Sequence, residues 1–341
     1  MPITTPLTSL LGITHPILSA PMDVIAGARL TAAVSEAGGF GILGGGYGEK
    51  AWLEQETAEL KKCRQPFGIG FITWSMAKQP ALLDIALAAR PRAIMSSFGD
   101  PKPHASRIRA AGSLLICQVQ NEDMAKQALD AGADILIAQG TEAGGHGASR
   151  TLIDIVPAII DLAAGRVPVV AAGGIADARG VVAVLALGAQ AAVLGTRFLA
   201  SAESRAHPHY KQRVLAANEE DTVRTILFGH GWPNAPHRTL RTAFVQQWLG
   251  QEGRGQESRP DEPVVGQTVI GGQPMPVLRF MGFPPNAEAS GDIDAMDLLA
   301  GQGIGLVREV KPAGQIVREL VEEAHHIISQ RLAGRSICQT L

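Results

Sequence analysis

The chain has 341 residues, of which 46% are hydrophobic and 18% are charged, and its formal net charge is −2. This balance predicts a globular protein with a large core, and the absence of Lys/Arg runs argues against nucleic acid or an anionic membrane as a partner. Cys63, Cys117 and Cys338 are far apart, with no Cys-x-x-Cys or Cys/His grouping, which argues against a disulfide framework or a zinc site. There is no leader-like segment and no apolar run of about 18 residues, so we expect a cytoplasmic protein without membrane spans.

Short apolar runs alternate with helical patterns over the first 200 residues. The apolar runs predict strands at residues 16–20, 40–43, 67–72, 93–97, 114–118, 135–139, 168–172 and 191–194. Apolar residues at helical spacing predict helices at residues 30–37, 52–62, 81–89, 125–131, 152–163 and 179–187. An α/β fold with eight such units is what a closed (β/α)₈ TIM barrel requires. A doubly wound open sheet is the alternative, but its Gly-x-Gly-x-x-Gly turn after the first strand is missing, and Ala20-Pro21-Met22 stands there instead.

The composition changes after Phe198. Residues 201–218 have helical spacing, whereas the segments 229–236, 249–263 and 273–286 are rich in turn formers, polar residues or proline. Residues 313–330 have the pattern of a final amphipathic helix. We therefore expect residues 1–200 plus 300–341 to form the barrel, and residues 201–299 to form a smaller lid domain of helices and loops.

Ligand groups in such a barrel come from the C-terminal ends of the strands and the loops that follow them. Gly173 and Gly174 follow Ala172 at the end of the seventh strand, and Gly195 and Thr196 follow the eighth. These two neighbouring glycine turns predict a phosphate site, because backbone N–H groups can approach an anion where no Cβ intervenes. The other candidates at strand ends are Ala20, Pro21, Met22, Gly70, Gln118 and Gln139.

His146 has the clearest functional context among the nine histidines. It lies after the sixth strand in the loop Gly-Thr-Glu-Ala-Gly-Gly-His-Gly, which spans residues 140–147. An imidazole with a pKa near ~6.5 can take or give a proton at neutral pH, so we expect His146 to act in the pocket. Glu142 in the same loop either orients His146 or caps backbone N–H groups. Trp232 either lines a substrate pocket or anchors a packed loop, and Cys117 is predicted to be a small buried hydrophobe.

Several motifs along the chain form a recognisable set. They are His-Pro-Ile-x-x-Ala-Pro-Met at 15–22, Ala-Gly-Gly-Phe-Gly at 37–41, Pro-Phe-Gly-Ile at 66–69, Gln-Gly-Thr-Glu-Ala-Gly-Gly-His at 139–146, Ala-Ala-Gly-Gly-Ile at 171–175 and Leu-Gly-Thr-Arg-Phe at 194–198. The set resembles the nitronate monooxygenases, formerly called 2-nitropropane dioxygenases, and residues 300–305 are also similar to that family. The resemblance spans nearly the whole chain, and the Glu-Ala-Gly-Gly-His segment is its most specific element.

The resemblance implies an FMN-dependent barrel in which His146 is the catalytic base. It places Ala20, Pro21 and Met22 against the isoalloxazine ring. It assigns the ring edge, ribityl chain and phosphate to Gln118, Gln139, Gly145, Gly173, Gly174, Gly195 and Thr196, and it places Gly70 and Ala172 at the same site. Two positions depart from the family pattern, because many members have Asn where this chain has Gly70 and Arg where it has Gly147.

The activity implied by the resemblance is the oxidation of a nitroalkane or nitronate with dioxygen, without a metal, and the resemblance allows for a homodimer. A flavin-dependent NAD(P)H reductase of the same superfamily, acting on an enoyl-acyl-carrier-protein or a quinone, is the first alternative. A non-catalytic flavin-binding protein is an alternative of a different class. A barrel like that of inosine monophosphate dehydrogenase is disfavoured, because it needs a Cys nucleophile and none lies between Gln139 and Arg150.

Overall fold

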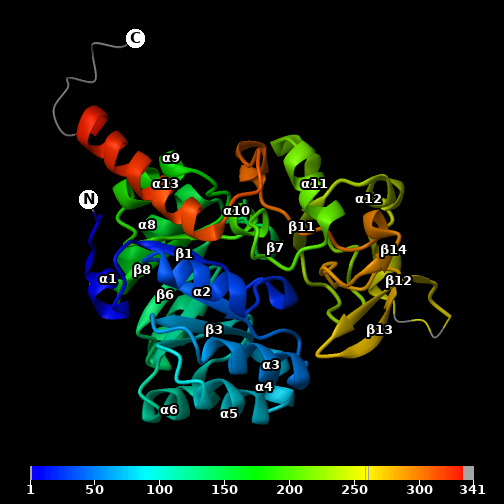
Figure 1. Cartoon of the computed structure of the whole chain (residues 1–341), viewed down its shortest axis with the longest axis horizontal. Coiled ribbons are helices and arrows are strands. Elements are labelled where there is room, and N and C mark those ends of the chain that lie inside the picture. The colour runs from blue at the N-terminus through cyan, green and yellow to red at the C-terminus, as the bar shows by residue number, and fades with distance from the viewer. Residues whose placement is uncertain (1, 258, 260, 333–341) are drawn as a thin grey trace.

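Eight parallel strands form a closed barrel in a computed structural model that describes residues 2–257, 259 and 261–332 (Figure 1). The strands are β1 (Ile17–Ser19), β2 (Gly41–Gly44), β3 (Phe67–Ile72), β4 (Ala93–Ser97), β5 (Leu114–Val119), β6 (Ile135–Gln139), β8 (Val169–Ala172) and β9 (Ala192–Leu194). Their order is β1-β9-β8-β6-β5-β4-β3-β2, and a parallel bridge between Leu18 and Phe40 closes the ring. The structure confirms the predicted TIM barrel, and every predicted strand agrees with the observed one to within one residue at either end.

Helices cover the outside of the barrel. They are α2 (Ala28–Glu36), α3 (Lys50–Leu60), α4 (Thr73–Lys78), α5 (Ala81–Ala88), α6 (Lys102–Ala110), α7 (Glu122–Asp130), α8 (Leu152–Ala163), α9 (Ala178–Ala186), α10 (Thr196–Leu199) and α13 (Ala313–Ile327). The predicted final helix is α13, which packs against α9 and α2 and completes the outer layer (Figure 1). None of the helices in the described residues is long and apolar enough to span a bilayer.

A short helix that the sequence analysis missed, α1 (Pro6–Leu11), closes the N-terminal end of the barrel. Its Leu7 and Leu11 are fully buried in the apolar cluster that fills the barrel interior. The Leu7 N–H donates to Oε1 of Gln190, just before β9, at 3.0 Å. Because this helix has only six residues, helical periodicity cannot reveal it, and its main signal is the reciprocal cap between Thr5 and Thr8.

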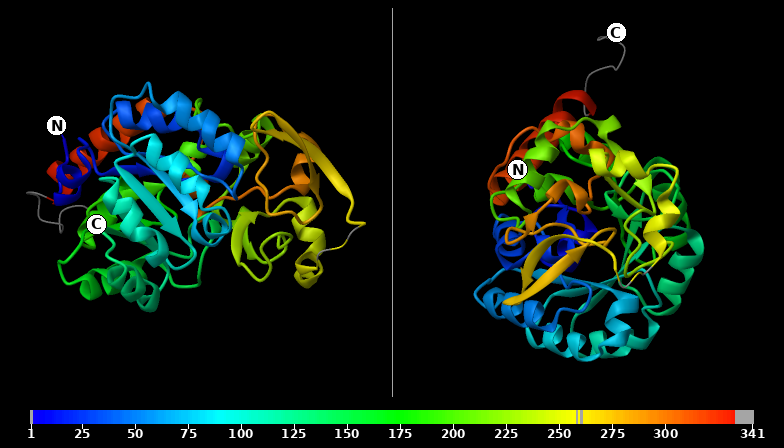
Figure 2. Two further views of the ribbon diagram at one scale, coloured as in Figure 1. Left: turned by 90° about the horizontal axis from the view of Figure 1, so that it is seen from below. Right: turned by 90° about the vertical axis from the view of Figure 1, so that its right-hand side faces the viewer.

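The segment 201–299 lies against one end of the barrel. The hairpin formed by its residues 264–278 stands in front of the ring of helices in the right-hand view of Figure 2. It contains α11 (Pro208–Ala216), β10 (Thr222–Thr225), β11 (His237–Leu240), α12 (Ala243–Trp248), β12 (Val264–Ile270), β13 (Gln273–Leu278) and β14 (Ser290–Gly291). Short helical turns occur at η1 (Asp23–Ile25), η2 (Glu219–Asp221), η3 (Glu252–Gln256), η4 (Ile293–Ala295), η5 (Gln302–Leu306) and η6 (Ile328–Leu332). The helix expected over residues 201–218 is confined to α11. The division of the chain into a barrel and a lid domain stays a prediction.

A small sheet joins this segment to the loop that carries His146. The two-residue strand β7 (Gly145–His146) pairs with β11, which in turn pairs with β10. His146 lies opposite His237, and Gly145 lies opposite Arg238. The backbone of the loop after β6 is therefore held by segment 201–299 as well as by the barrel.

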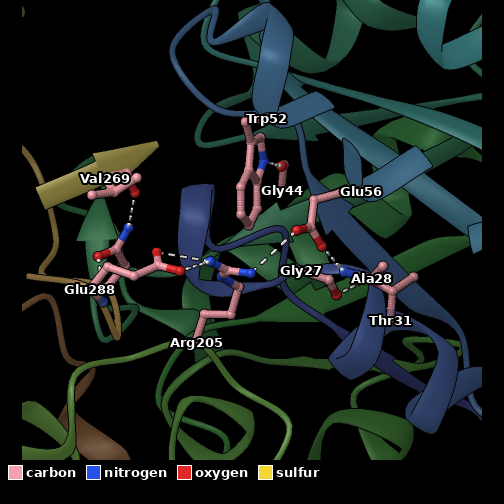
Figure 3. A network of polar contacts seen from close by, with 10 residues as sticks. Gly27, Ala28, Thr31, Gly44, Trp52, Glu56, Arg205, Val269 and Glu288 are labelled. Carbon is pink, nitrogen blue, oxygen red and sulfur yellow. Dashed lines mark hydrogen bonds and ion pairs between the residues drawn. The ribbon is translucent and has the colours of Figure 1, made fainter. Parts of the chain in front are cut away.

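Arg205 forms a second link between the barrel and segment 201–299 (Figure 3). Its guanidinium donates to both carboxylate oxygens of Glu288, at 2.7 and 2.9 Å, and lies 5.0 Å from the ring centroid of Trp52. It also contacts Oε1 of Glu56 at 3.5 Å, while Oε2 of Glu56 accepts the N–H of Ala28 at 2.6 Å. Ala28 begins α2, so Glu56 on α3 supplies the N-terminal cap of a neighbouring helix.

Removal of this cap should cost measurable stability. We expect Glu56→Ala to lower the free energy of unfolding by roughly 1–2 kcal/mol, which is the usual cost of losing an N-terminal cap. Glu56→Gln should lower the free energy of unfolding by less, because the amide oxygen of Gln can still accept the Ala28 N–H. Burial also raises the pKa of Glu56, so a neutral amide replaces a carboxyl group that already ionises less readily. Chemical denaturation of the two variants checks the expectation, and wild-type stability in Glu56→Ala would show that the cap contributes nothing.

Candidate active site

A cavity lies at the C-terminal ends of the barrel strands. It contains about 1280 Å³ of empty space, counting the part that is open to solvent. Segment 201–299 contributes Tyr210, Pro284 and Leu299 to its lining, so the cavity lies between this segment and the barrel. The structure brings all the sequence-predicted site residues to it: Ala20, Pro21, Met22, Gly70, Gln118, Gln139, Gly145, His146, Ala172, Gly173, Gly174, Gly195 and Thr196.

One wall of the cavity is built from glycine backbone. Gly173 and Gly174 have φ angles of 129° and 65°, which residues with a Cβ rarely adopt. Within the described part of the chain, the N–H groups of Gly173, Gly174 and Gly195 donate to no acceptor. The Thr196 hydroxyl accepts the N–H of Gly301 at 3.0 Å, which leaves its own hydrogen for another acceptor. This set of unused donors, here called the glycine cradle, is suited to hold an anion.

Gln139 fixes the loop that carries His146. Its Oε1 accepts hydrogen bonds from the side-chain amides of Gln118 at 3.1 Å and Gln120 at 2.8 Å. Its Nε2 donates to the backbone carbonyl of His146 at 3.0 Å. Together with the pairing of β7 and β11, these bonds set the position of His146 before any ligand binds.

The imidazole of His146 is enclosed by other rings. The residue is 9% exposed, and its ring centroid lies 4.0 Å from that of Trp232, 5.2 Å from that of His237 and 6.1 Å from that of Phe98. Nε2 lies 3.3 Å from the hydroxyl oxygen of Tyr47, which lines the cavity. The ring is therefore fixed by packing, with Nε2 beside a hydroxyl group at the cavity.

This environment changes the proton affinity of His146. Burial, with a smaller contribution from charge repulsion by His237 and Arg224, lowers its pKa to about 3. The expectation of a pKa near ~6.5 was therefore wrong, because the sequence does not show which rings surround the imidazole. At neutral pH the ring is therefore uncharged. It can accept a proton at the nitrogen with the lone pair, but it is not an imidazolium that could donate one. The arrangement favours a base over an acid.

The structure also shows the surroundings of Glu142, Trp232 and Cys117. The carboxylate of Glu142 accepts the N–H of Leu152 at 2.9 and 3.1 Å, so it caps α8 rather than orienting His146. Trp232 packs against the ring of His146. Cys117 is 2% exposed within the core, and burial raises its pKa to about 12, as expected for an inert thiol. Cys338 lies outside the described residues.

Tyr47, Asp23 and Phe98 are among the cavity residues that the sequence analysis missed. Tyr47 lies in the loop after β2, whose run of glycines was the available signal. Asp23 and Phe98 have φ angles of 31° and 60°, and backbone strain of this kind clusters at functional sites. Both carboxylate oxygens of Asp23 are buried and have no hydrogen-bond partner in the described residues. The pKa of Asp23 is raised well above its usual value, first by burial and then by Glu49.

Comparison with known proteins gives this cavity a context. The family model for nitronate monooxygenase matches residues 4–89 and 72–323. The chain belongs to the nitronate monooxygenase family. Nitronate monooxygenase of Pseudomonas aeruginosa is 32% identical, over 94% of this chain and 99% of that protein. Nitronate monooxygenase npaC of Metarhizium robertsii is 32% identical, over 93% of both chains.

Other proteins that are similar to this chain carry different names. The (3aS,4S,5R,7aS)-5-hydroxy-7a-methyl-1-oxo-octahydro-1H-indene-4-carboxyl-CoA dehydrogenase of Mycobacterium tuberculosis is 33% identical, over 75% of this chain and 71% of that protein. Among solved structures, FabK from Thermotoga maritima aligns with a TM-score of 0.79 and 31% identity, over 96% of this chain and 98% of that chain. Nitroalkane oxidase from Streptomyces ansochromogenes aligns with a TM-score of 0.72 and 27% identity, over 95% and 99%. The chain is thus an oxidoreductase of a family that is flavin-dependent in general.

The residues that line this cavity fit a flavin. The glycine cradle leaves donors free for a phosphate, and the cavity has the volume for a planar ring system beside it. A Cβ at Gly70 would lie 2.5 Å from Cβ of Pro21, so the Asn of many family members has no room here. Arg224 reaches the neighbourhood of Gly147, where many members have Arg, and its Nη2 donates to the Gly147 carbonyl at 2.8 Å.

Proposed function

We propose that this protein is an FMN-dependent nitronate monooxygenase that oxidises alkyl nitronates and nitroalkanes with dioxygen. The observation that carries the proposal is an uncharged, buried imidazole, that of His146, on the wall of the same cavity as the glycine cradle. The names of the relatives from P. aeruginosa and M. robertsii, which match nearly the whole chain, support the choice of substrate.

The glycine cradle supports FMN rather than FAD, because its free donors form one anion site and FMN ends in a single phosphate. In this proposal Gly173, Gly174, Gly195 and Thr196 hold the phosphate, and Ala20, Pro21 and Met22 lie against the ring. The proposal assigns the ring edge and ribityl chain to Gln118, Gln139 and Gly145, with Gly70 and Ala172 at the same site. FMN supplies electron transfer between the substrate anion and dioxygen when it is bound. A homodimer and a cytoplasmic location stay predictions.

In this proposal His146 takes the α-proton of a neutral nitroalkane at Nε2. The enclosing rings exclude water from the imidazole, which keeps the ring uncharged and ready to accept a proton. A pKa of about 3 alone would make it a weak base. The nitronate anion formed beside the ring is an opposite charge, which raises the pKa of His146 as the proton arrives. A pre-formed nitronate needs no such step.

A second candidate function is supported by the 33% identity to the CoA-thioester dehydrogenase of M. tuberculosis. In that case the protein would exchange electrons with a nicotinamide nucleotide, like the reductases of the same superfamily, and His146 would serve a different substrate. A flavin-binding protein without catalysis is a third outcome.

The two candidates differ in what reduces the flavin. Under anaerobic conditions, ethyl nitronate should bleach or shift the flavin spectrum of the purified protein, whereas NADH and NADPH should do so slowly or not at all. Stopped-flow absorbance measures all three, and chromatography of the released pigment should show FMN. Fast reduction by NADH or NADPH, with reoxidation by a quinone or an enoyl thioester, would replace the proposed function with the reductase, and FAD in the pigment would contradict the cofactor assignment.

A further inference from the structure

Tyr47 brings a hydroxyl group to the proposed base. Its oxygen lies 3.3 Å from Nε2 of His146, and the residue lines the cavity. Its backbone carbonyl accepts a hydrogen bond from the Ser75 hydroxyl. Its ring packs against Trp74 and Trp232, at centroid distances of 6.2 and 6.3 Å. The position of the hydroxyl is therefore set by contacts with α4 and with the loop that carries Trp232, independent of any ligand.

This hydroxyl is a hydrogen-bond donor at neutral pH. Burial raises the pKa of Tyr47 well above its usual value, and the carboxyl groups of Asp23, Asp297 and Glu49 raise it further. The O–H bond therefore stays intact, and the group can donate to an acceptor in the cavity. The carboxyl groups that face Tyr47 also disfavour any negative charge on its own oxygen.

The imidazole beside it presents a lone pair. A neutral imidazole has one N–H group and one nitrogen with a lone pair. Nδ1 of His146 is buried and has no hydrogen-bond partner within the described residues. Nε2 is the nitrogen next to the Tyr47 hydroxyl, and in the tautomer that lets it act as the base the ring hydrogen is on Nδ1 and the lone pair of Nε2 faces the hydroxyl. The cavity wall thus carries a donor, the Tyr47 hydroxyl, and an acceptor, Nε2 of His146, side by side.

We propose that the Tyr47 hydroxyl donates a hydrogen bond to the substrate oxygen that becomes anionic when Nε2 of His146 takes the proton from the adjacent carbon acid. The inference rests on the proposed function. In a nitroalkane one nitrogen atom separates the acidic carbon from the nitro oxygens, so neighbouring groups 3.3 Å apart can address both. The C–H bond breaks and an N–H bond forms at Nε2, while the electron pair becomes a C=N bond and the charge moves to oxygen. Tyr47 keeps its proton throughout.

This role predicts different losses for a neutral and an anionic substrate. With nitroethane the charge develops only in the transition state, so Tyr47→Phe should lower kcat by about 10²-fold, the usual effect of removing one donor to a developing oxyanion. With ethyl nitronate the charge is already present on binding, so the variant should mainly raise KM and retain kcat. Steady-state kinetics of both substrates, at equal flavin content, measures this split.

Tyr210→Phe is the matched control, because the chain has only two tyrosines and both line the cavity. The hydroxyl of Tyr210 donates to the backbone carbonyl of Leu299, so its removal should change both substrates by the same factor. The proposal for Tyr47 is overturned if Tyr47→Phe keeps wild-type constants or loses both substrates equally. If the wild-type protein turns over neither substrate, the proposed function fails first and the role of Tyr47 with it.

Discussion

His146→Asn is expected to lower the turnover of nitroethane by about 10²–10⁴-fold, the usual contribution of a general base. Asn keeps a polar side chain of similar reach but cannot accept a proton near neutral pH. Ethyl nitronate has already lost this proton, so its turnover should fall much less. Flavin content should stay near that of the wild type, because the glycine cradle does not include His146. Kinetics on both substrates, with the flavin spectrum of each preparation, tests these expectations together.

The pH dependence gives a second measure of the same group. Because the folded pKa of His146 is about 3, the ring is uncharged throughout pH 5–8, and the nitroethane rate should show no limb near the ordinary histidine pKa of ~6.5. Unfolding exposes this histidine, so between the two pKa values the unfolded chain binds the extra proton. The contribution of His146 to stability is therefore full above the unfolded pKa and is lost as the pH falls toward 3. His146→Asn should remove that part of the acid sensitivity.

Three results would contradict this account of His146. Equal losses on nitroethane and ethyl nitronate would assign the residue to binding or to the flavin. A rate limb near pH 6.5 that vanishes in the variant would show that the imidazole is solvated in the working enzyme. Wild-type kinetics in His146→Asn would make it an ordinary buried histidine.

The strands of the barrel could be predicted because parallel strands covered on both faces are continuous apolar runs, as in the fully buried β6. The same reasoning fails in the separate three-stranded sheet with the order β13-β12-β14. Pro274 and Pro276 lie in β13, although proline usually argues against a strand. β13 is an edge strand, so the missing N–H groups cost no ladder bond where they face outward. The helix α6 was missed because its apolar stripe is short, with His104, Ala105 and Ile108 as its buried residues.

The candidate site likewise has one part that could be predicted from the sequence and one part that could not. Its glycine cradle could be predicted, because barrel topology brings the ends of neighbouring strands together and only the local sequence is needed to see the glycines. The ring cluster could not, because Tyr47, Trp232 and His237 reach His146 from loops and strands that are distant in the sequence. The pKa of His146 is a property of that cluster, and its low value follows from contacts rather than from the loop motif.

Gly174→Val should largely remove the flavin from the purified protein. Gly174 has a φ angle of 65°, and a Cβ there would lie 2.9 Å from Cβ of Glu142. The new side chain would thus push on the loop whose Glu142 caps α8, and the strained backbone would turn the free N–H groups away from a common anion. Strain of about 1–3 kcal/mol, with the loss of those donors, corresponds to an affinity for the flavin weaker by about 10- to 100-fold. Absorbance at the flavin band, relative to protein, measures the occupancy.

A matched control separates this loss from the general cost of a side chain in a left-handed conformation. Gly112 has a φ angle of 78°, and a Cβ there would meet no heavy atom of the described residues within 4 Å. Gly112→Val therefore carries comparable backbone strain at a position that does not line the cavity, and it should lower the melting temperature while keeping the flavin. Titration of each apoprotein with FMN distinguishes weak binding from poor folding, because a folded Gly174→Val protein should still bind at high FMN concentration. A full flavin spectrum in Gly174→Val would show that the phosphate is held elsewhere, and the same loss in Gly112→Val would show that backbone strain alone causes the loss of flavin. In that case the donors of the glycine cradle would need another anionic ligand, and the cofactor assignment would lose its main structural support.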